Sequence, residues 1–212
     1  MSQREFLPAA GRDVFLPLYD PLVSLMGFGC AGKELISQSN IEPSQSVLDV
    51  GCGTGTLIVM LKRQYSAVKV VGLDPDLKAL QRAQRKAMRA GVSVQLDHGF
   101  ADELPYAEGS FDRVFSSFMF HHLDEPERER TSREVLRVLK PGGSFHLLDF
   151  VVNGGSPGFF DRLFGGHAHM KTNTNKRILG LLSGAGFTNV TKVKDGSMLF
   201  GLMRTSYFRA TV

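Results

Sequence analysis

The sequence predicts a single α/β domain with a doubly wound, mostly parallel sheet of seven strands that ends in an antiparallel hairpin. Two observations lead to this class. From about Val47 onward, short β-rich apolar runs alternate with longer segments of helical periodicity, as expected for βαβ units. After the last helical segment, two strand-like runs follow one another with only a turn signal between them, which is typical of an antiparallel pair.

The composition of this 212-residue chain is that of a globular protein, with 42% hydrophobic and 22% charged residues. Its 25 Lys and Arg against 21 Asp and Glu leave a net charge of +4, which permits an anionic partner without requiring one. The two cysteines, Cys30 and Cys52, exclude a disulfide-rich scaffold. The sequence shows neither an apolar run of about 20 residues nor the pattern of a signal peptide, so we expect a cytoplasmic protein without a membrane span.

The first forty or so residues are expected to form a helical cap on the sheet. Asp20 precedes Pro21, which is the usual order of an N-cap and a first helical residue. Gly27, Gly29 and Gly32 then interrupt the helical pattern.

Seven β-rich runs are predicted to form the strands of the sheet. They are 46–50, 68–73, 92–96, 111–116, 144–151, 189–193 and 199–211. Between the last two runs lies Asp195-Gly196, a dipeptide typical of hairpins, so we expect the chain to turn there.

Helical periodicity is found in four segments, which are 57–65, 76–90, 126–139 and 174–186. In the second of these, the apolar residues fall on roughly one face; they are Leu77, Leu80, Ala83, Ala87 and Met88. The basic residues of the same segment are expected to face solvent and not RNA; they are Arg82, Arg85, Lys86 and Arg89. The stretch 153–173 is rich in Gly, Phe and His, and a loop of this length is usually functional or disordered.

The strongest signal is the run Val47-Leu-Asp-Val-Gly-Cys-Gly-Thr-Gly-Thr56, in which a buried strand leads through a glycine-rich turn into a helix. Gly51, Gly53 and Gly55 leave no side chains between the backbone and a ligand, and they permit a positive φ. The start of the following helix offers unpaired N–H groups to a carboxylate or a phosphate. The turn is therefore expected to bind a ligand.

This turn differs from the fingerprint of dinucleotide-binding proteins. The third glycine of that pattern is replaced by Thr56. Asp49, near the end of the strand, would repel a pyrophosphate but would suit a cation. Both features argue against a nicotinamide dehydrogenase.

Asp74 ends the second predicted strand, about 20 residues after the glycine-rich turn. In doubly wound folds an acid at this place binds ribose hydroxyls, and its two oxygens can accept from both the 2′- and the 3′-OH. The alternative is that Asp74 caps the next helix, but Asp76 is the better candidate for that cap.

Five motifs follow one another through the middle of the chain. They are Val47-Leu-Asp-Val-Gly-Cys-Gly-Thr-Gly55, Gly72-Leu-Asp-Pro75, Ala101-Asp-Glu-Leu-Pro-Tyr106, Ser110-Phe-Asp-Arg-Val114 and Glu134-Val-Leu-Arg-Val-Leu-Lys-Pro-Gly-Gly143. Together they strongly resemble the class I S-adenosylmethionine-dependent methyltransferases, and among these the small-molecule group that includes the ubiquinone and menaquinone C-methyltransferases. The resemblance covers about residues 45 to 150. It implies a Rossmann-like fold, S-adenosylmethionine as cofactor and S-adenosylhomocysteine as product.

The resemblance also implies roles for single residues. Asp49 would face the cationic methionine end of the cofactor, and the glycine backbone would bind its carboxylate. Asp74, followed by Pro75, would hold the ribose. Tyr19, in a Tyr-Asp pair that the ubiquinone-type enzymes also carry, would close over the cofactor.

One position departs from the family. The acid that bonds the adenine amino group there is replaced by Phe100, which can pack on adenine but cannot accept a hydrogen bond. The N–H of Ala101 could still meet a ring nitrogen, and Asp102 is the alternative acceptor. Losing one such bond would cost about 1 kcal/mol.

The end of the fourth predicted strand faces the ligand crevice in this fold. Ser116 and Ser117 are therefore placed to contact the methionine part of the cofactor or the acceptor. His121 or His122 is a candidate general base, with His122 preferred, because imidazole titrates near neutrality. The alternative for each is a structural role in the loop.

We therefore expect methyl transfer by in-line displacement at the sulfonium methyl, with a small, partly apolar molecule as acceptor. The acceptor pocket is expected between the strand ends, the cap and the loop 153–173; its candidate apolar residues are Phe118, Phe120, Phe159, Phe160 and Phe164. We expect residues 1–212 to form one methyltransferase domain, with a helical cap over 1–44, a cofactor-binding core over 45–150, and a substrate loop, helix and hairpin over 151–212.

Alternatives remain open at this point. One is a methyltransferase acting on RNA or protein, which the sequence pI near 9.2 weakly supports. The Asn- or Asp-Pro-Pro-aromatic motif of amino-directed DNA methyltransferases is absent, so nucleic acid is disfavoured. The other is a non-catalytic module that binds S-adenosylmethionine. No metal is expected, because His167-Ala-His169 lacks a third ligand. Whether the chain forms a homodimer is left open.

Overall fold

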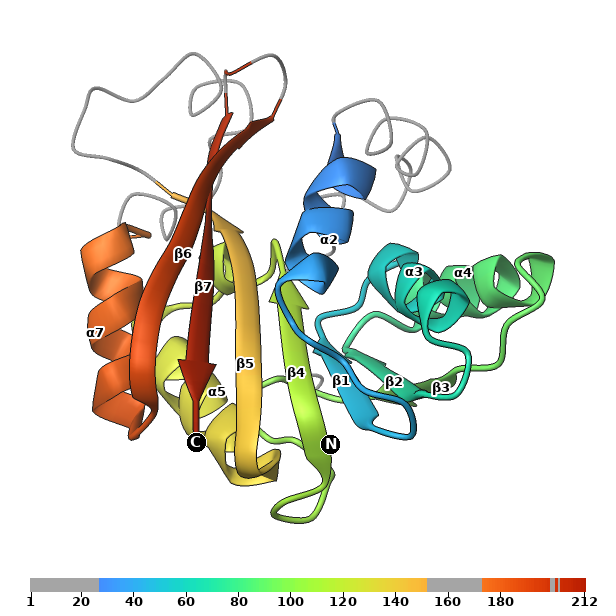
Figure 1. Ribbon diagram of the computed structural model, residues 1–212, viewed down its shortest axis with the longest axis horizontal. Coiled ribbons are helices and arrows are strands. Elements are labelled where there is room, and N and C mark those ends of the chain that lie inside the picture. Colours follow the sequence, from blue (N-terminus) through green and yellow to red (C-terminus); the bar gives the residue numbers. More distant parts are fainter. Residues whose placement is uncertain (1–26, 152–172, 199–200, 202) are drawn as a thin grey trace.

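The structure, a computed structural model, describes residues 27–151, 173–198, 201 and 203–212. Its centre is one seven-stranded sheet in the order β3-β2-β1-β4-β5-β7-β6 (Figure 1). The strands are β1 (Ser46–Val50), β2 (Lys69–Asp74), β3 (Gln95–His98), β4 (Phe111–Ser117), β5 (Leu139–Phe150), β6 (Thr188–Met198) and β7 (Met203–Thr211). The first five pair in parallel, and β7 runs antiparallel to both β5 and β6. The predicted fold class is confirmed.

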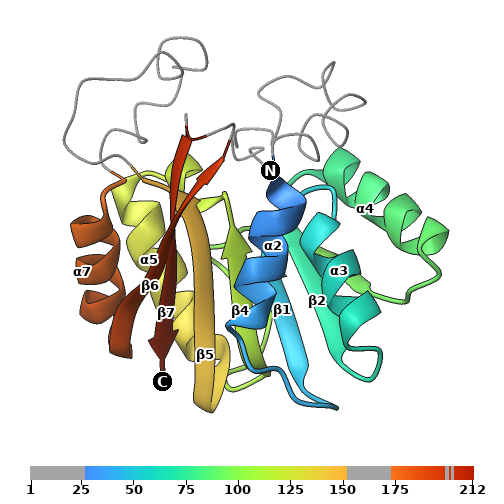
Figure 2. The same ribbon diagram turned by 45° about the horizontal axis from the view of Figure 1, so that its top comes forward.

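Helices cover both faces of the sheet (Figure 2). They are α2 (Phe28–Ser37), α3 (Thr56–Gln64), α4 (Leu77–Arg89), the short 3₁₀ helix η2 (Phe120–His122), α5 (Glu125–Val138) and α7 (Asn175–Ala185). One apolar core lies between the sheet and α5 and α7, and a second lies between the sheet and α2, α3 and α4. Among the described residues, no helix has the length and apolar character needed to cross a membrane.

Capping residues explain where several helices begin. Asp76 caps α4 by accepting from the N–H groups of Lys78 and Ala79, as predicted. Asp124 and Glu127 form a reciprocal capping box at the start of α5. Thr174 caps α7 through the N–H of Arg177. The start of this helix at 175 agrees with the predicted segment.

Two predictions about glycines were wrong. The helix α2 continues through Gly29 and Gly32. Gly32 faces α3, where a Cβ would make ordinary van der Waals contact with Leu57 and Met60 at 3.4 Å. Asp195-Gly196 is not the hairpin turn either, because both residues pair with β7 inside β6. A Cβ at Gly196 would lie 2.7 Å from Thr205 Oγ1, so this glycine permits close cross-strand contact.

The predicted apolar face of α4 is also wrong in part. Leu80, Ala83 and Ala87 are buried, together with Ala79, but Leu77 and Met88 are exposed. In addition, β3 begins at Gln95 and not at 92, so the strand is shorter and shifted toward its carboxyl end.

Candidate active site

The glycine-rich turn that follows β1 is fixed by backbone hydrogen bonds. The N–H groups of Gly51 and Cys52 donate to the carbonyl of Leu73 at 2.8 and 3.0 Å, which ties the turn to the end of β2. Gly51, Gly53 and Gly55 all have positive φ, between 52° and 79°. Glycine adopts this conformation without the strain that an L side chain would add.

The three glycines have different surroundings. A Cβ at Gly51 would lie 2.5 Å from Met119 Cγ, so the turn after β4 packs directly on it. A Cβ at Gly55 would lie 2.7 Å from Ala83 Cβ, which brings α4 against the start of α3. A Cβ at Gly53 would meet no described atom within 4 Å. Gly53 therefore borders the open space in which a ligand can lie.

Asp49 carries a buried carboxyl group in β1. It is 1% exposed, and neither carboxyl oxygen has a hydrogen-bond partner among the described residues. Burial raises the pKa of Asp49 well above its usual range, and the nearby carboxylate of Asp74 raises it further. A cation brought to this position would supply the missing partner.

Asp74 lies at the end of β2 and connects the glycine-rich turn to α4. Its Oδ2 accepts from the N–H of Gly53 at 2.8 Å, and its Oδ1 accepts from the N–H of Asp76 at 2.9 Å. Burial raises the pKa of Asp74 to about 6, although both hydrogen bonds oppose this shift. Each oxygen keeps a second lone pair, so the carboxylate can also accept from a ligand hydroxyl. The carbonyl of Pro75 lies 3.0 Å from His98 Nε2.

The two cysteines differ in environment. Cys52 is buried in the glycine-rich turn beside Gly72, where a Cβ would lie 2.8 Å from its sulfur. Burial raises the pKa of the Cys52 thiol, and the charges of Asp74 and Asp49 raise it further. Cys30, in α2, is exposed.

A segment after β3 carries the candidate adenine contacts. Phe100 and Ala101 are half-buried, and Ala101 packs against the core on the α5 side. Asp102, the alternative acceptor, forms an ion pair with Arg130 at 2.9 Å. An adenine contact through Asp102 would have to compete with this ion pair.

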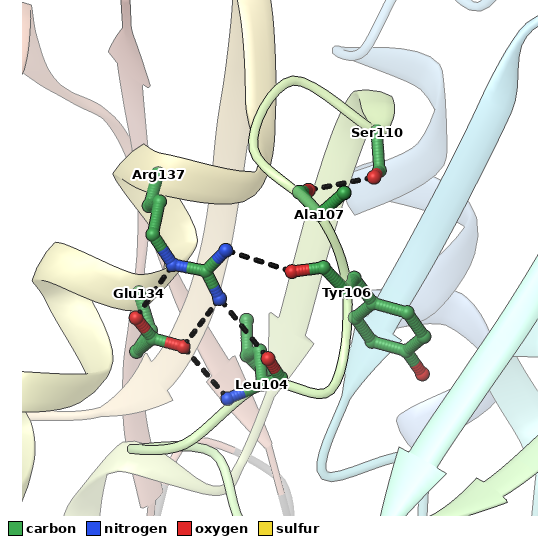
Figure 3. Close-up of polar contacts among 6 residues, drawn as sticks. All are labelled: Leu104, Tyr106, Ala107, Ser110, Glu134 and Arg137. Carbon is green, nitrogen blue, oxygen red and sulfur yellow. Dashed lines mark hydrogen bonds and ion pairs between the residues drawn. The ribbon is translucent and has the colours of Figure 1, made fainter.

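Two side chains of α5 clamp the continuation of this segment (Figure 3). Arg137 donates to the carbonyls of Tyr106 and Leu104, while Glu134 accepts from the N–H of Leu104. Glu134 and Arg137 also pair with each other at 2.7 Å. Because their partners are backbone groups, the clamp fixes the path of the chain that begins at Phe100.

The end of β4 brings further candidates toward the glycine-rich turn. Ser116 is fully buried, and its hydroxyl has no partner among the described residues, while Ser117 is half-buried. Phe118 has a φ of 55°, which is strained for an aromatic residue, and its ring lies 4.4 Å from Phe28 and 4.7 Å from Phe150. Strain of this kind is concentrated at functional sites.

His121 and His122 lie in η2, directly after this strained residue. The Nδ1 of His121 lies 2.6 Å from Oδ1 of Asp149, whose Oδ2 accepts from the N–H of His121 at 2.8 Å. Both side chains are buried. His122 is half-buried, and its ring lies 4.1 Å from that of His121. The structure therefore gives His121 an orienting carboxylate.

Sequence reasoning missed three neighbours of the site. Asp149 lies near the end of the fifth predicted strand, and an acid at that place was an available signal. Met119 covers Gly51. Lys86 of α4 donates to the hydroxyls of Thr54 and Thr56 at 3.1 and 2.8 Å, so it stabilises the glycine-rich turn from outside.

The remaining candidates divide into two groups. Phe120 is fully buried and packs on Phe145, so it belongs to the core and not to the wall of an acceptor pocket. The other candidates lie outside the described residues; they are Tyr19, Phe159, Phe160, Phe164, His167 and His169.

The chain is similar to known methyltransferases. Residues 47–143 match a family described as methyltransferase domain. A demethylmenaquinone methyltransferase of Thermus thermophilus is 34% identical over 137 residues, which cover 63% of this chain and 61% of that protein. The chain spans about half the length of other curated relatives that it matches.

Solved structures show the same fold. A phosphoethanolamine N-methyltransferase of Haemonchus contortus, in complex with S-adenosylhomocysteine, has a TM-score of 0.74 at 16% identity, covering 85% of this chain and 52% of that one. The [4+2]-cyclase SpnF has a TM-score of 0.74 at 22% identity, covering 86% and 80%. Over residues 47–143 the chain is therefore similar to S-adenosylmethionine-dependent methyltransferases, whose cofactor is S-adenosylmethionine.

Proposed function

We propose that this protein transfers the methyl group of S-adenosylmethionine to a small, partly apolar acceptor, with His121 as general base. The observation that carries the proposal is the buried His121–Asp149 pair beside the glycine-rich turn. The two are linked through Met119, which precedes η2 and packs on Gly51. We further propose that residues 1–212 act as one domain.

The residues around the turn fit the cofactor. Asp49 presents a buried carboxyl group without a partner among the described residues, which suits the ammonium or sulfonium of the methionine part. Gly53 borders open space, and the neighbouring start of α3 suits a carboxylate. Asp74 can accept from ribose hydroxyls, and Phe100 with Ala101 can contact the adenine. S-adenosylmethionine supplies an electrophilic methyl group on a good leaving group.

The His121–Asp149 pair can remove a proton from the acceptor. An ionised carboxylate only accepts, so the contact between Nδ1 and Asp149 places the proton of the neutral imidazole on Nδ1. The Nε2 then carries the lone pair that accepts a proton from a hydroxyl or an activated carbon. Asp149 also favours the imidazolium that forms, because its charge is opposite. Burial of the pair excludes water from this step.

The apolar character of the acceptor is supported by the rings around the end of β4. Phe28, Phe118 and Phe150 form one cluster, and the ring of His121 lies 5.3 Å from Phe150. A relative named for demethylmenaquinone, which is an apolar quinone, is in line with this class.

The experiment measures transfer of labelled methyl to a panel of phenols and quinols with and without an alkyl chain. His121→Asn and Asp149→Asn should each lower kcat by about a hundredfold or more, while the affinity for S-adenosylhomocysteine stays within a few-fold of wild type. His122→Asn is the matched control on the neighbouring ring and should lose much less. Melting temperatures of all variants confirm that each is folded.

Three outcomes would contradict the proposal. A large loss in His122→Asn, with His121→Asn fully active, would assign the base to His122. Tight binding of S-adenosylhomocysteine without transfer to any acceptor would favour a non-catalytic binding module. Transfer to RNA or protein alone would favour the macromolecular alternative.

A further inference from the structure

The helix α4 carries an unusual concentration of positive charge. It contains five basic residues and no acidic one; they are Lys78, Arg82, Arg85, Lys86 and Arg89. Without them, the rest of the chain would have 20 basic against 21 acidic residues. The positive excess of the protein therefore lies on one helix of 13 residues.

The same helix exposes two large apolar side chains. Leu77 is 57% and Met88 is 69% exposed, which makes them the two most exposed large hydrophobic residues in the described part of the chain. They are 11 positions apart, which is within about 20° of three full helical turns, so both lie on one side of α4, about 16 Å apart. Gln81 and Gln84 lie between them on that side.

The helix is anchored to the protein by its opposite side. Ala79, Leu80, Ala83 and Ala87 are buried, and α4 contacts β2 and β3 at the edge of the sheet. Figures 1 and 2 both show α4 on the outside of the molecule at that edge. Its outer face is therefore presented to solvent along the length of the helix.

Three of the five cations of α4 carry a charge that no other described residue neutralises. None of the ion pairs among the described residues involves Arg82, Arg85 or Arg89. Arg85 donates from Nε to the carbonyl of Gln81 in its own helix, which leaves its charge unneutralised. Lys78 and Arg89 are exposed at the two ends of α4.

We propose that the outer face of α4 binds the surface of a membrane that contains anionic phospholipids. Two aliphatic side chains on one side, flanked by Lys and Arg, are the pattern of a helix that lies in the membrane interface. The long stems of Lys and Arg can lie along the apolar layer while their charges reach the phosphates. Single-stranded RNA would call for aromatic residues on which bases stack, and α4 has none.

This surface is close to the candidate active site. Leu77 follows Asp76 directly, and Asp76 donates its N–H to the Asp74 carboxylate beside the glycine-rich turn. A membrane bound along α4 would therefore lie next to the carboxyl end of β2, where the cofactor is expected. The proposal itself does not depend on methyl transfer.

The test is co-sedimentation of the full chain with vesicles of phosphatidylcholine and phosphatidylglycerol in equal amounts, compared with pure phosphatidylcholine. We expect binding to the mixed vesicles that weakens with salt. Lys78→Gln/Arg85→Gln/Arg89→Gln should weaken partitioning by well over tenfold, because each cation near such a surface contributes about tenfold or somewhat less. Leu77→Gln/Met88→Gln should weaken it several-fold at unchanged charge.

A matched control removes three exposed cations elsewhere, through Lys33→Gln/Lys176→Gln/Arg204→Gln. This variant has the same net charge as the α4 charge variant and should keep at least half of the binding. Equal losses in the two charge variants would overturn the proposal, since binding would then follow net charge alone. No binding of the wild type to mixed vesicles would also overturn it. So would a protein that does not bind vesicles but binds single-stranded RNA, if the α4 charge variant loses that RNA binding.

Discussion

The buried histidine of β5 makes stability depend on pH in a way that can be isolated. His146 is 1% exposed, its Nε2 lies 2.9 Å from the hydroxyl of Ser144, and its ring stacks on Phe115. Burial lowers the pKa of His146 to about 3, and the guanidinium groups of Arg209 and Arg113 contribute to this shift. In the unfolded chain the pKa returns to about 6.5.

The sign of the effect follows from these two values. Below about pH 6.5 His146 becomes protonated in the unfolded chain but stays neutral in the folded protein, so acid favours unfolding. At pH 4.5 the difference is about two pH units, or about 3 kcal/mol in the free energy of unfolding. Asp74 acts in the opposite direction, because its pKa is raised to about 6 in the folded protein and its protonation there stabilises the fold.

A substitution by an uncharged residue separates the contribution of His146 to the pH dependence from the contributions of the carboxyl groups. His146→Gln keeps an amide that can bond Ser144 and cannot become charged. Urea unfolding at pH 7.5 and pH 4.5 should show that the wild type loses about 3 kcal/mol more than the variant between these values. Asp74 and the other acids contribute equally to both proteins and cancel in the difference. Parallel losses, within about 0.5 kcal/mol, would refute the burial argument.

Three further predictions concern the cofactor site. Gly55→Ala should lower the free energy of unfolding in urea by about 2 kcal/mol or more, because its Cβ meets Ala83 at positive φ. Gly53→Ala should lower it by only about 1 kcal/mol but weaken the affinity for S-adenosylhomocysteine more than tenfold in calorimetry. The reverse pattern would contradict this assignment. S-adenosylhomocysteine should release a proton on binding, seen as an enthalpy that depends on the buffer, since its ammonium lowers the raised pKa of Asp49. This dependence should disappear in Asp49→Asn, and its persistence there would exclude Asp49 as the source. Arg137→Met should lower stability by about 1 to 2 kcal/mol and weaken the same ligand several-fold, because the clamp on the adenine segment is lost; unchanged affinity would limit the clamp to stability.

The sequence predicted the architecture well because the signals of the central sheet are local. The strands β1, β2, β4 and β5 each contain an apolar run, whereas β3 is mostly polar and its start was misplaced. The order of strand, glycine-rich turn and helix around Gly53 can be recognised without knowing what lies nearby. The hairpin was recognised, but its turn was misplaced. Gly196 leaves room for Thr205 on the neighbouring strand. A glycine needed for such a contact cannot be distinguished in the sequence from a glycine needed for a turn until the strand register is known.

The pairing of His121 with Asp149 could not be predicted from the sequence, because it also depends on how the strands pair. The two residues are 28 positions apart, and they meet only because β4 and β5 pair in parallel with Ser117 opposite Leu148. In α4, helical periodicity and three of the five predicted buried residues were correct, while Leu77 and Met88 were wrongly assigned to the buried side. The helix lies on the sheet through small alanines such as Ala83, so the larger Leu77 and Met88 are left outside.

The contrast between the two cysteines makes the chain suitable for site-selective chemistry without mutagenesis. Thiol reagents react with the thiolate form of cysteine. The raised pKa of Cys52 disfavours its thiolate, and burial keeps reagents away from its sulfur. A maleimide dye should therefore attach to Cys30 alone. This residue lies in α2, two positions after Phe28, whose ring contacts the strained Phe118. A dye there would report, through its emission, on rearrangements at the end of β4 when a ligand enters.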